Sequence, residues 1–288
     1  MGIINVTPDS FSDGGRYLDY EKAVDHAQSL LRQGADIIDI GGESTRPGAT
    51  TALQDENHLR SVAPNARSAK GSAVTAEEEI RRVIPVIAEL KKRSPASVLS
   101  VDTYKSDVAR EAVEAGAEIV NDVTGFRGDA EMAKTVAELE CGAVLMHMRG
   151  CPDQWRMLPP PEDVVQLVKR ELKESATRAI SSGVGHESLV LDPGFGFGKK
   201  FAENDPLFAR FHELHELGFP LLAGVSRKSL IGRMLAKNGK DAPLDARLYG
   251  TLAAEVALIL EGAHIIRTHE VKPTVEAARA ADTILRAR

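Results

Sequence analysis

Residues 97–123 read SVLSVDTYKSDVAREAVEAGAEIVNDV, and this one stretch holds a complete strand, helix and strand pattern. Segments 97–102 and 118–123 are short runs of valine, leucine and isoleucine, and segment 106–115 between them has the spacing of an amphipathic helix. Gly116 is suited to the left-handed residue that commonly ends a helix. The stretch therefore predicts a βαβ unit with parallel strands.

The same unit repeats along the chain, which is 288 residues long. Near-uniform spacing of the repeats favours a closed (β/α)8 TIM barrel over an open doubly wound sheet, which usually has about five or six strands. Barrels of about 250 residues form one domain, so we expect a single domain over residues 1–288. The predicted strands are 2–6, 36–41, 97–102, 118–123, 142–148, 189–192, 221–225 and 264–269. The predicted helices are 21–33, 76–93, 106–115, 130–140, 162–182, 205–217, 245–261 and 274–287.

The composition narrows the class of protein. The hydrophobic share of 43% is enough for a large core, and the formal net charge of -6 argues against a nucleic-acid groove or a polybasic membrane patch. The only two cysteines, Cys141 and Cys151, lack metal-ligand spacing, and so few cysteines argue against a disulfide framework, which indicates a reducing compartment. No apolar run approaches the length of about 18 residues that a spanning helix needs. We expect a cytoplasmic protein without nucleic-acid or membrane partners.

One polar segment interrupts the repeat between Gly48 and Thr75. We interpret residues 49–74 as a loop inserted after the second strand, which in a barrel is on the catalytic face. Loops of such length are usually functional or mobile. A tolerated surface insertion is the open alternative.

Polar or charged residues end all eight predicted strands. In a β/α barrel the carboxyl ends of the strands form the active site, so these side chains are the candidate functional residues. A purely structural barrel has no reason to collect them at one end. They are Asn5, Asp39 with Glu43, Asp102, Asn121 with Asp122, His147, Asp192, Ser226 with Lys228, and Arg267 with His269.

Two chemical subsets stand out. Lys228, Arg267 and His269 are basic and follow the last two strands, where barrels commonly bind phosphate, and a guanidinium grips phosphate oxygens as a fork. The segment 226–232 has the pattern of a short helix. For Arg267 the alternative is a surface salt bridge. Asp102 and Asp192, together with the amide of residue 121, suit a flat ring rich in N–H donors; metal binding and core hydrogen bonding are the alternatives.

Three further features are less specific. The loop 5–15 begins at Asn5 and is rich in oxygen ligands suited to Mg²⁺. Segment 194–199, GFGFGK, lacks the spacing of a nucleotide-binding loop, so its glycines more plausibly let the backbone approach a ligand, with Phe197 as an aromatic wall. We expect His147 to be a buried, hydrogen-bonded residue rather than a catalytic one.

Two motifs then suggest a family. Residues 2–15, GIINVTPDSFSDGG, and residues 41–48, GGESTRPG, resemble the two signature motifs of the dihydropteroate synthases. Six shorter motifs follow in the family's order: SVDT at 100–103, VND at 120–122, LMHM at 145–148, DPGFGFGK at 192–199, SRKS at 226–229 and IRTH at 266–269. The resemblance covers nearly the whole chain, although the family usually carries residues before the first strand.

The resemblance implies a transferase of folate biosynthesis. It would join 6-hydroxymethyl-7,8-dihydropterin pyrophosphate to p-aminobenzoate with the help of Mg²⁺, as a homodimer formed through its last helices. Three residues would act in catalysis: Asp102, Lys228 and Arg267. The pterin would be held by Asp102, Asn121, Met146, Asp192 and Lys228. The pyrophosphate would be held by Asn5, Arg267 and His269, with Asn5 also binding the metal. The p-aminobenzoate side would be lined by Thr45, Arg46, Pro47, Phe197 and Ser226.

Three other interpretations follow from the same residues. The insertion lies next to the segment that would bind p-aminobenzoate, which sulfonamides mimic, so we hypothesise a synthase that discriminates against these drugs. A pterin-dependent methyltransferase would share the acidic residues but would not need the basic motifs SRKS and IRTH. A catalytically silent paralogue should have lost charged strand ends, and none is missing here.

Overall fold

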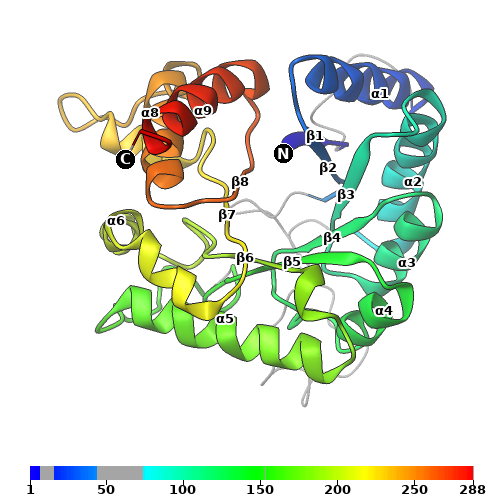
Figure 1. The fold of residues 1–288 in the computed structure, drawn as a ribbon, viewed down its shortest axis with the longest axis horizontal. Coiled ribbons are helices and arrows are strands. Elements are labelled where there is room, and N and C mark those ends of the chain that lie inside the picture. The colour runs from blue at the N-terminus through cyan, green and yellow to red at the C-terminus, as the bar shows by residue number, and fades with distance from the viewer. Residues whose placement is uncertain (7–15, 44–73, 153, 288) are drawn as a thin grey trace.

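The strands of the computed structural model form a ring that is surrounded by helices (Figure 1). The structure describes residues 1–6, 16–43, 74–152 and 154–287. Strands β1 to β6 pair in parallel in sequence order, and β7 pairs in parallel with β8. Two isolated parallel bridges, Leu191 to Leu221 and Gly2 to Thr268, complete the ring. The predicted TIM-barrel fold is therefore confirmed.

All eight predicted strands are present in the described part of the chain, and the last two are shorter than predicted. The strands are β1 Gly2–Asn5, β2 Ile37–Gly41, β3 Val98–Asp102, β4 Ile119–Asp122, β5 Gly142–Met146, β6 Leu189–Asp192, β7 Leu222–Ala223 and β8 Ile265–Ile266. The α-helices are α1 Arg16–Arg32, α2 Ala76–Arg93, α3 Ser106–Glu114, α4 Met132–Leu139, α5 Val164–Ser181, α6 Phe201–Ala209, α7 Ser229–Met234, α8 Leu248–Leu260 and α9 Val271–Leu285. Short 3-10 helices are η2 His186–Ser188, η3 Phe211–Leu217 and η4 Leu244–Ala246.

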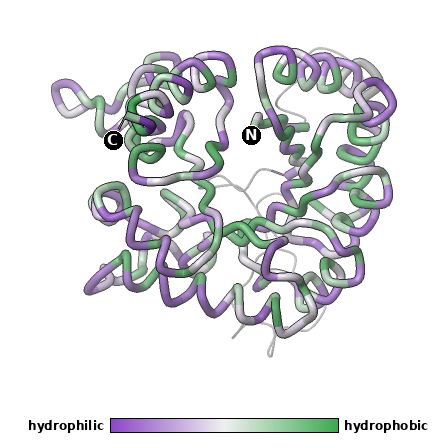
Figure 2. The backbone as a smooth tube through the Cα atoms, viewed as in Figure 1, coloured by the Kyte–Doolittle hydropathy of each residue, from purple (hydrophilic) through white to green (hydrophobic). Residues whose placement is uncertain are grey.

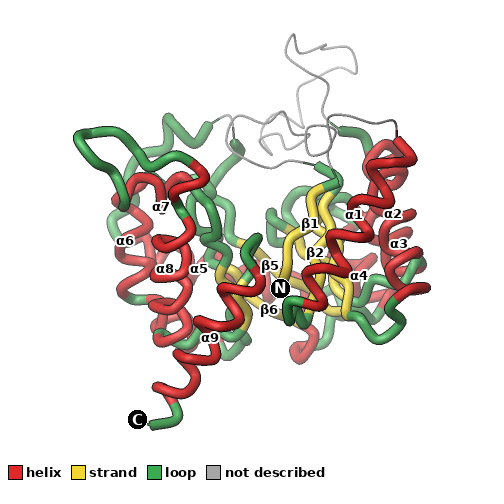
Figure 3. Tube along the Cα trace, turned by 90° about the horizontal axis from the view of Figure 1, so that it is seen from above, coloured by secondary structure: helices red, strands yellow, loops and turns green. Residues whose placement is uncertain are grey.

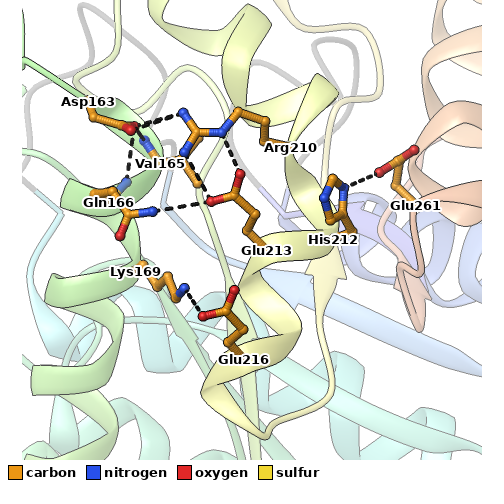
Figure 4. A network of polar contacts seen from close by, with 9 residues as sticks. All are labelled: Asp163, Val165, Gln166, Lys169, Arg210, His212, Glu213, Glu216 and Glu261. Atoms are coloured by element: carbon orange, nitrogen blue, oxygen red, sulfur yellow. Dashed lines mark hydrogen bonds and ion pairs between the residues drawn. The ribbon is translucent and has the colours of Figure 1, made fainter.

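Two predicted helices are each divided in the structure, and the predicted helix 21–33 begins earlier, at Arg16. The predicted helix 205–217 is divided into α6 and η3 at Arg210, whose φ of -123° is not helical. At this break the Arg210 guanidinium pairs with Asp163 at 3.0 Å and with Glu213 at 2.6 Å, and His212 pairs with Glu261 at 2.7 Å (Figure 4). These contacts link Arg210 and η3 to the residue before α5 and the residue after α8. The predicted helix 245–261 likewise divides into η4 and α8.

Helix α2 illustrates why the sequence folds in this way. Thr75 caps its N-terminus, where the side-chain hydroxyl accepts a hydrogen bond from the backbone of Glu78 at 3.2 Å. Val83, Ile87 and Leu90 then repeat at helical spacing and are fully buried against the barrel. Hydrophobic residues dominate the central strands, whereas hydrophilic ones are frequent on the outer helices (Figure 2).

The arrangement around the strands is clearest after a quarter turn. The strands lie between α1–α4 on one side and α6–α9 on the other (Figure 3). The predicted inserted loop lies outside the described residues, apart from residue 74. Within the described segments, every helix is too short or too polar to cross a lipid bilayer.

Candidate active site

A cavity of about 440 Å³ opens at the carboxyl ends of the strands. Its lining includes every residue predicted to bind substrate or to act in catalysis that lies in the described part of the chain, whereas the strand-end candidates Asp39, Asp122 and His147 do not line it. Thr45, Arg46 and Pro47 are outside that part. The predicted residues that the cavity brings together are Asn5, Asp102, Asn121, Met146, Asp192, Phe197, Ser226, Lys228, Arg267 and His269.

The cationic centre of the cavity is Arg267, which follows β8. Its Nε donates to Asp39 Oδ2 at 2.6 Å and its Nη2 donates to Asp102 Oδ2 at 2.7 Å. The ion pair is internal, because Asp39 is fully buried and the Arg267 side chain is only 20% exposed. The alternative of a surface salt bridge is therefore wrong. Burial raises the pKa of the Asp102 carboxyl, and the neighbouring Arg267 opposes that rise.

Asp39 is a residue to which the sequence assigned no role beyond ending a strand. It lies in β2 and accepts hydrogen bonds from Ser100 Oγ at 2.6 Å and Asn121 Nδ2 at 3.1 Å, besides the one from Arg267. It is not among the residues that line the cavity. Asp39 thus holds both Asn121, which is expected to bind the flat ring, and Arg267, which is expected to bind phosphate. A carboxylate inside the apolar strand IIDIG was the signal that could have identified it.

The cavity lining also contains an acid and an amine. Asp192, at the end of β6, accepts a hydrogen bond on Oδ1 from the backbone of Gly194 at 2.7 Å. Lys228 donates to the carbonyl of Phe195 at 2.7 Å, and its Nζ lies 4.6 Å from the centre of the Phe197 ring. Burial raises the pKa of Asp192 and lowers the pKa of Lys228 to about 8, and each charge opposes the shift of the other.

Comparison with known proteins places this geometry in a family. The profile described as "Pterin binding enzyme" matches residues 1–73 and 59–269. The dihydropteroate synthase of Escherichia coli (strain K12) is 42% identical over 288 residues, which is 100% of this chain and 92% of the relative. The chain belongs to the dihydropteroate synthase family. It is therefore a transferase.

Solved structures of dihydropteroate synthases agree with this assignment. The Clostridium difficile enzyme, solved in the presence of pteroic acid, has a TM-score of 0.85 and 42% identity, covering 99% of this chain and 96% of the other. The Xanthomonas albilineans enzyme with 4-aminobenzoic acid has a TM-score of 0.84 and 43% identity, covering 99% of this chain and 92% of the other.

The synthase cavity also has an apolar wall. Tyr104, Val123 and two methionines form a small buried cluster separate from the main core, and Trp155 and Phe197 pack against it. The Trp155 ring meets the Phe197 ring edge-on with 5.7 Å between centroids. Sequence reasoning missed Trp155, because its neighbours form no strand or helix pattern.

The loops after β7 and β8 are joined to each other. Ser226 Oγ accepts from the backbone N–H of His269 at 3.1 Å and contacts its Nδ1 at the same distance. Arg227 between the site residues has a φ of 60°, which is unusual for a side chain of this size, and pairs with Glu270 at 2.8 Å. The predicted short helix is present as α7, which begins at Ser229.

His147 and Glu43 complete the polar side chains of interest. His147 is 2% exposed and its Nε2 lies 3.1 Å from Glu171, so the prediction of a buried, hydrogen-bonded histidine is confirmed. Burial lowers the pKa of His147 to about 3. Glu43 lines the cavity and accepts hydrogen bonds from Tyr104 at 2.8 Å and Lys105 at 2.6 Å.

The donor set of the described residues limits how a metal could bind. These residues contain no group of three histidine, cysteine or acidic side chains suited to a metal ion. Mg²⁺ commonly keeps several waters and uses one or two protein oxygens together with substrate phosphates. Asn5 shares the cavity with Arg267 and His269. The amide oxygen of Asn5, beside the basic residues Arg267 and His269, fits a Mg²⁺ ion that enters the cavity bound to a diphosphate.

Proposed function

We propose that this chain joins 6-hydroxymethyl-7,8-dihydropterin pyrophosphate to p-aminobenzoate and releases 7,8-dihydropteroate and pyrophosphate. One observation carries the proposal: Arg267 shares a single cavity with Asp102, Asn121 and Asp192. The cavity therefore offers acceptors for a ring rich in N–H groups and a cation for its anionic tail. Membership of the synthase family supports the same reaction.

The pterin would bind on the acidic side of the cavity. Asp192 and Asp102 would accept hydrogen bonds from the ring, and Asn121 would both donate and accept. Met146 would pack against the ring, and Lys228 would donate to it. Apart from Lys228, which precedes α7, these groups are at the ends of the neighbouring strands β3 to β6, so the barrel sets their spacing.

The pyrophosphate would bind on the basic side. Arg267 would grip its oxygens as a fork, and His269 would donate a further hydrogen bond. Asn5 would help to hold Mg²⁺ at the same oxygens. When bound, that ion would neutralise the negative charge of the leaving group. The hydrogen bonds of Arg267 Nε to Asp39 and of Nη2 to Asp102 orient the guanidinium within the cavity.

The p-aminobenzoate would approach along the wall formed by Phe197 and Ser226. The residues Thr45, Arg46 and Pro47, which the family resemblance assigns to the same ligand, are outside the described part of the chain. Phe197 would stack against the benzene ring. Its contact with the ammonium of Lys228 keeps the two substrate positions adjacent.

In the reaction, the C–O bond between the pterin methylene and the pyrophosphate breaks, and the pyrophosphate leaves with the bonding electrons. The methylene then carries positive charge that the pterin ring shares. The amine nitrogen of p-aminobenzoate forms the new C–N bond and releases a proton to water. Asp102 would stabilise the developing positive charge and Arg267 the departing negative charge, with Lys228 orienting the ring. Positioning and electrostatics therefore supply most of the catalysis.

A coupled assay of pyrophosphate release tests the proposal. The purified chain receives Mg²⁺ and both substrates, and parallel reactions omit p-aminobenzoate or replace it with a methyl-accepting corrinoid protein and methyltetrahydrofolate. We expect pyrophosphate release that depends on p-aminobenzoate. A folded protein that binds the pterin and releases no pyrophosphate would be a silent paralogue, and methyl transfer would identify the methyltransferase alternative.

Further properties remain proposals. We propose a homodimeric, cytoplasmic protein with one domain over residues 1–288 and an inserted loop at 49–74. We also propose that the insertion discriminates against sulfonamides. The inhibition constant for sulfamethoxazole, compared with that of a synthase without the insertion, tests this idea. Equal constants would contradict it.

A further inference from the structure

Lys199 is a buried cation next to the cavity. It follows β6, is only 6% exposed and does not line the cavity. Its Nζ donates to the carbonyls of Gly194 at 2.7 Å, His147 at 3.2 Å and Phe197 at 3.2 Å. An ammonium has three N–H donors, so all of them are used on main-chain oxygens. Lys199 therefore has no donor left for a substrate.

The three oxygens belong to two segments that lie directly on each other. A Cβ atom on Gly194 would be 2.0 Å from the carbonyl oxygen of His147, and one on Gly198 would be 2.1 Å from that of Arg149. Both glycines also have positive φ, 62° and 68°. The backbones of the two segments are thus in close contact, and three carbonyl oxygens converge on the Lys199 Nζ. A cation there offsets their mutual repulsion.

The loop that Lys199 holds carries functional side chains. Phe197 lies in its middle, and the Gly194 N–H is the donor to the Asp192 carboxylate. Two other side chains also contact the backbone of this loop: Asn204 Oδ1 accepts from the Gly196 N–H at 2.8 Å, and Lys228 donates to the Phe195 carbonyl at 2.7 Å. Burial pulls the pKa of Lys199 well below its usual value, and the charge of Asp192 opposes this.

We propose that Lys199 is a positioning residue that sets the Phe197 ring for the second substrate. It acts from beneath the cavity by holding the 194–198 backbone in one conformation. The assignment of that substrate as p-aminobenzoate rests on the proposed function. The inference that Lys199 holds the loop does not depend on the proposed function.

A double-variant cycle tests the link to Phe197. Lys199→Met keeps the side-chain length and removes the charge and the donors, and Phe197→Ala removes the ring. We expect Lys199→Met to raise the KM for p-aminobenzoate about tenfold, and the double variant to have the same KM as Phe197→Ala. Lys173→Met, on the exposed face of α5, is the matched control and should leave the KM unchanged. If the fold-increase in KM of the double variant equals the product of the increases in the two single variants, the proposal is overturned.

A second readout does not depend on synthase activity. Trp155 is the single tryptophan of the chain and its ring contacts Phe197, so its fluorescence reports on the loop. We expect Lys199→Met, and not Lys173→Met, to shift the Trp155 emission to the red and to increase its quenching by acrylamide. Unchanged emission and quenching in Lys199→Met would overturn the proposal.

The two readouts separate failure of this inference from failure of the proposed function. If the unmodified protein releases no pyrophosphate, the proposed reaction is wrong and the fluorescence comparison alone decides the role of Lys199. If Lys199→Met does not fold, Lys199→Gln, which retains two N–H donors, replaces it in both experiments with the same expected and contrary results.

Discussion

Replacement of Arg267 by methionine is expected to damage stability and substrate binding through two separate contacts. Its Nε and Nη2 lie 2.6 Å and 2.7 Å from carboxylate oxygens of Asp39 and Asp102. Removal of one partner from a buried ion pair costs about 3–5 kcal/mol, because the remaining charge is left uncompensated. Asp102 is partly exposed and can take up a proton, whereas Asp39 is fully buried. Most of the lost stability should therefore come from Asp39.

The double variant Arg267→Met with Asp39→Asn separates the two effects. Asparagine has nearly the shape of aspartate, and the Ser100 hydroxyl can accept as well as donate a hydrogen bond. Without a buried unpaired charge, the double variant should regain about 2 kcal/mol relative to Arg267→Met. Urea unfolding at neutral pH of the unmodified protein, Arg267→Met, Asp39→Asn and the double variant measures this coupling energy.

Calorimetric titration with the pterin pyrophosphate and with the bare pterin then measures binding. The double variant should regain stability but not affinity for the pyrophosphate ester, because the cation is still missing. If the double variant is no more stable than Arg267→Met, the argument about Asp39 is wrong. If it binds the ester as tightly as the unmodified protein, Arg267 does not hold the pyrophosphate.

Three further predictions concern other buried groups. Asp192→Asn should weaken binding of the bare pterin by about 1–3 kcal/mol, because ring donors lose their acceptor. Calorimetry that shows an unchanged affinity for the bare pterin would contradict this role of Asp192. Burial raises the pKa of Glu255 to about 7. The carboxyl therefore holds its proton more tightly in the folded than in the unfolded protein. As pH rises from about 4.5 to about 7, the free energy of unfolding falls by about 3 kcal/mol in total. Glu255→Gln should thus be more stable than the unmodified protein near pH 8 but not near pH 4, and urea midpoints that differ equally at both pH values would refute this. The lowered pKa of His147, about 3, keeps that side chain neutral in the fold, so its contribution is fully present above about pH 6.5 and is lost as pH falls toward 3. The stability of His147→Gln should fall less steeply across this range, and parallel pH profiles for the two proteins would exclude the histidine as the cause.

The repeat pattern and the polar strand ends were readable from the sequence because both depend on local order along the chain. Short apolar runs, amphipathic segments and glycine ends predicted all eight strands, and strand ends such as Asp102 and Asp192 pointed to one face of the barrel. The ends of helices were less predictable. At the break, for example, Arg210 forms ion pairs with Asp163 and Glu213, and Asp163 is distant in sequence, at the N-terminal cap of α5.

Contacts between distant segments were decided only by the tertiary structure. Asp39 and Arg267 are 228 positions apart in the chain, yet their ion pair orders the centre of the site. The role of Lys199 follows from carbonyl groups, which have the same chemistry at every residue, so no sequence pattern could reveal it. Trp155 likewise reaches the cavity from an irregular loop.

The sequence by itself determined the fold, the family and the face of the barrel where chemistry occurs, because periodicity and motif order are properties of the chain alone. The tertiary structure decided which charges share a partner, which are buried and how their pKa values shift. These properties depend on distance and on exclusion of water, and both arise only when the strands close into a ring.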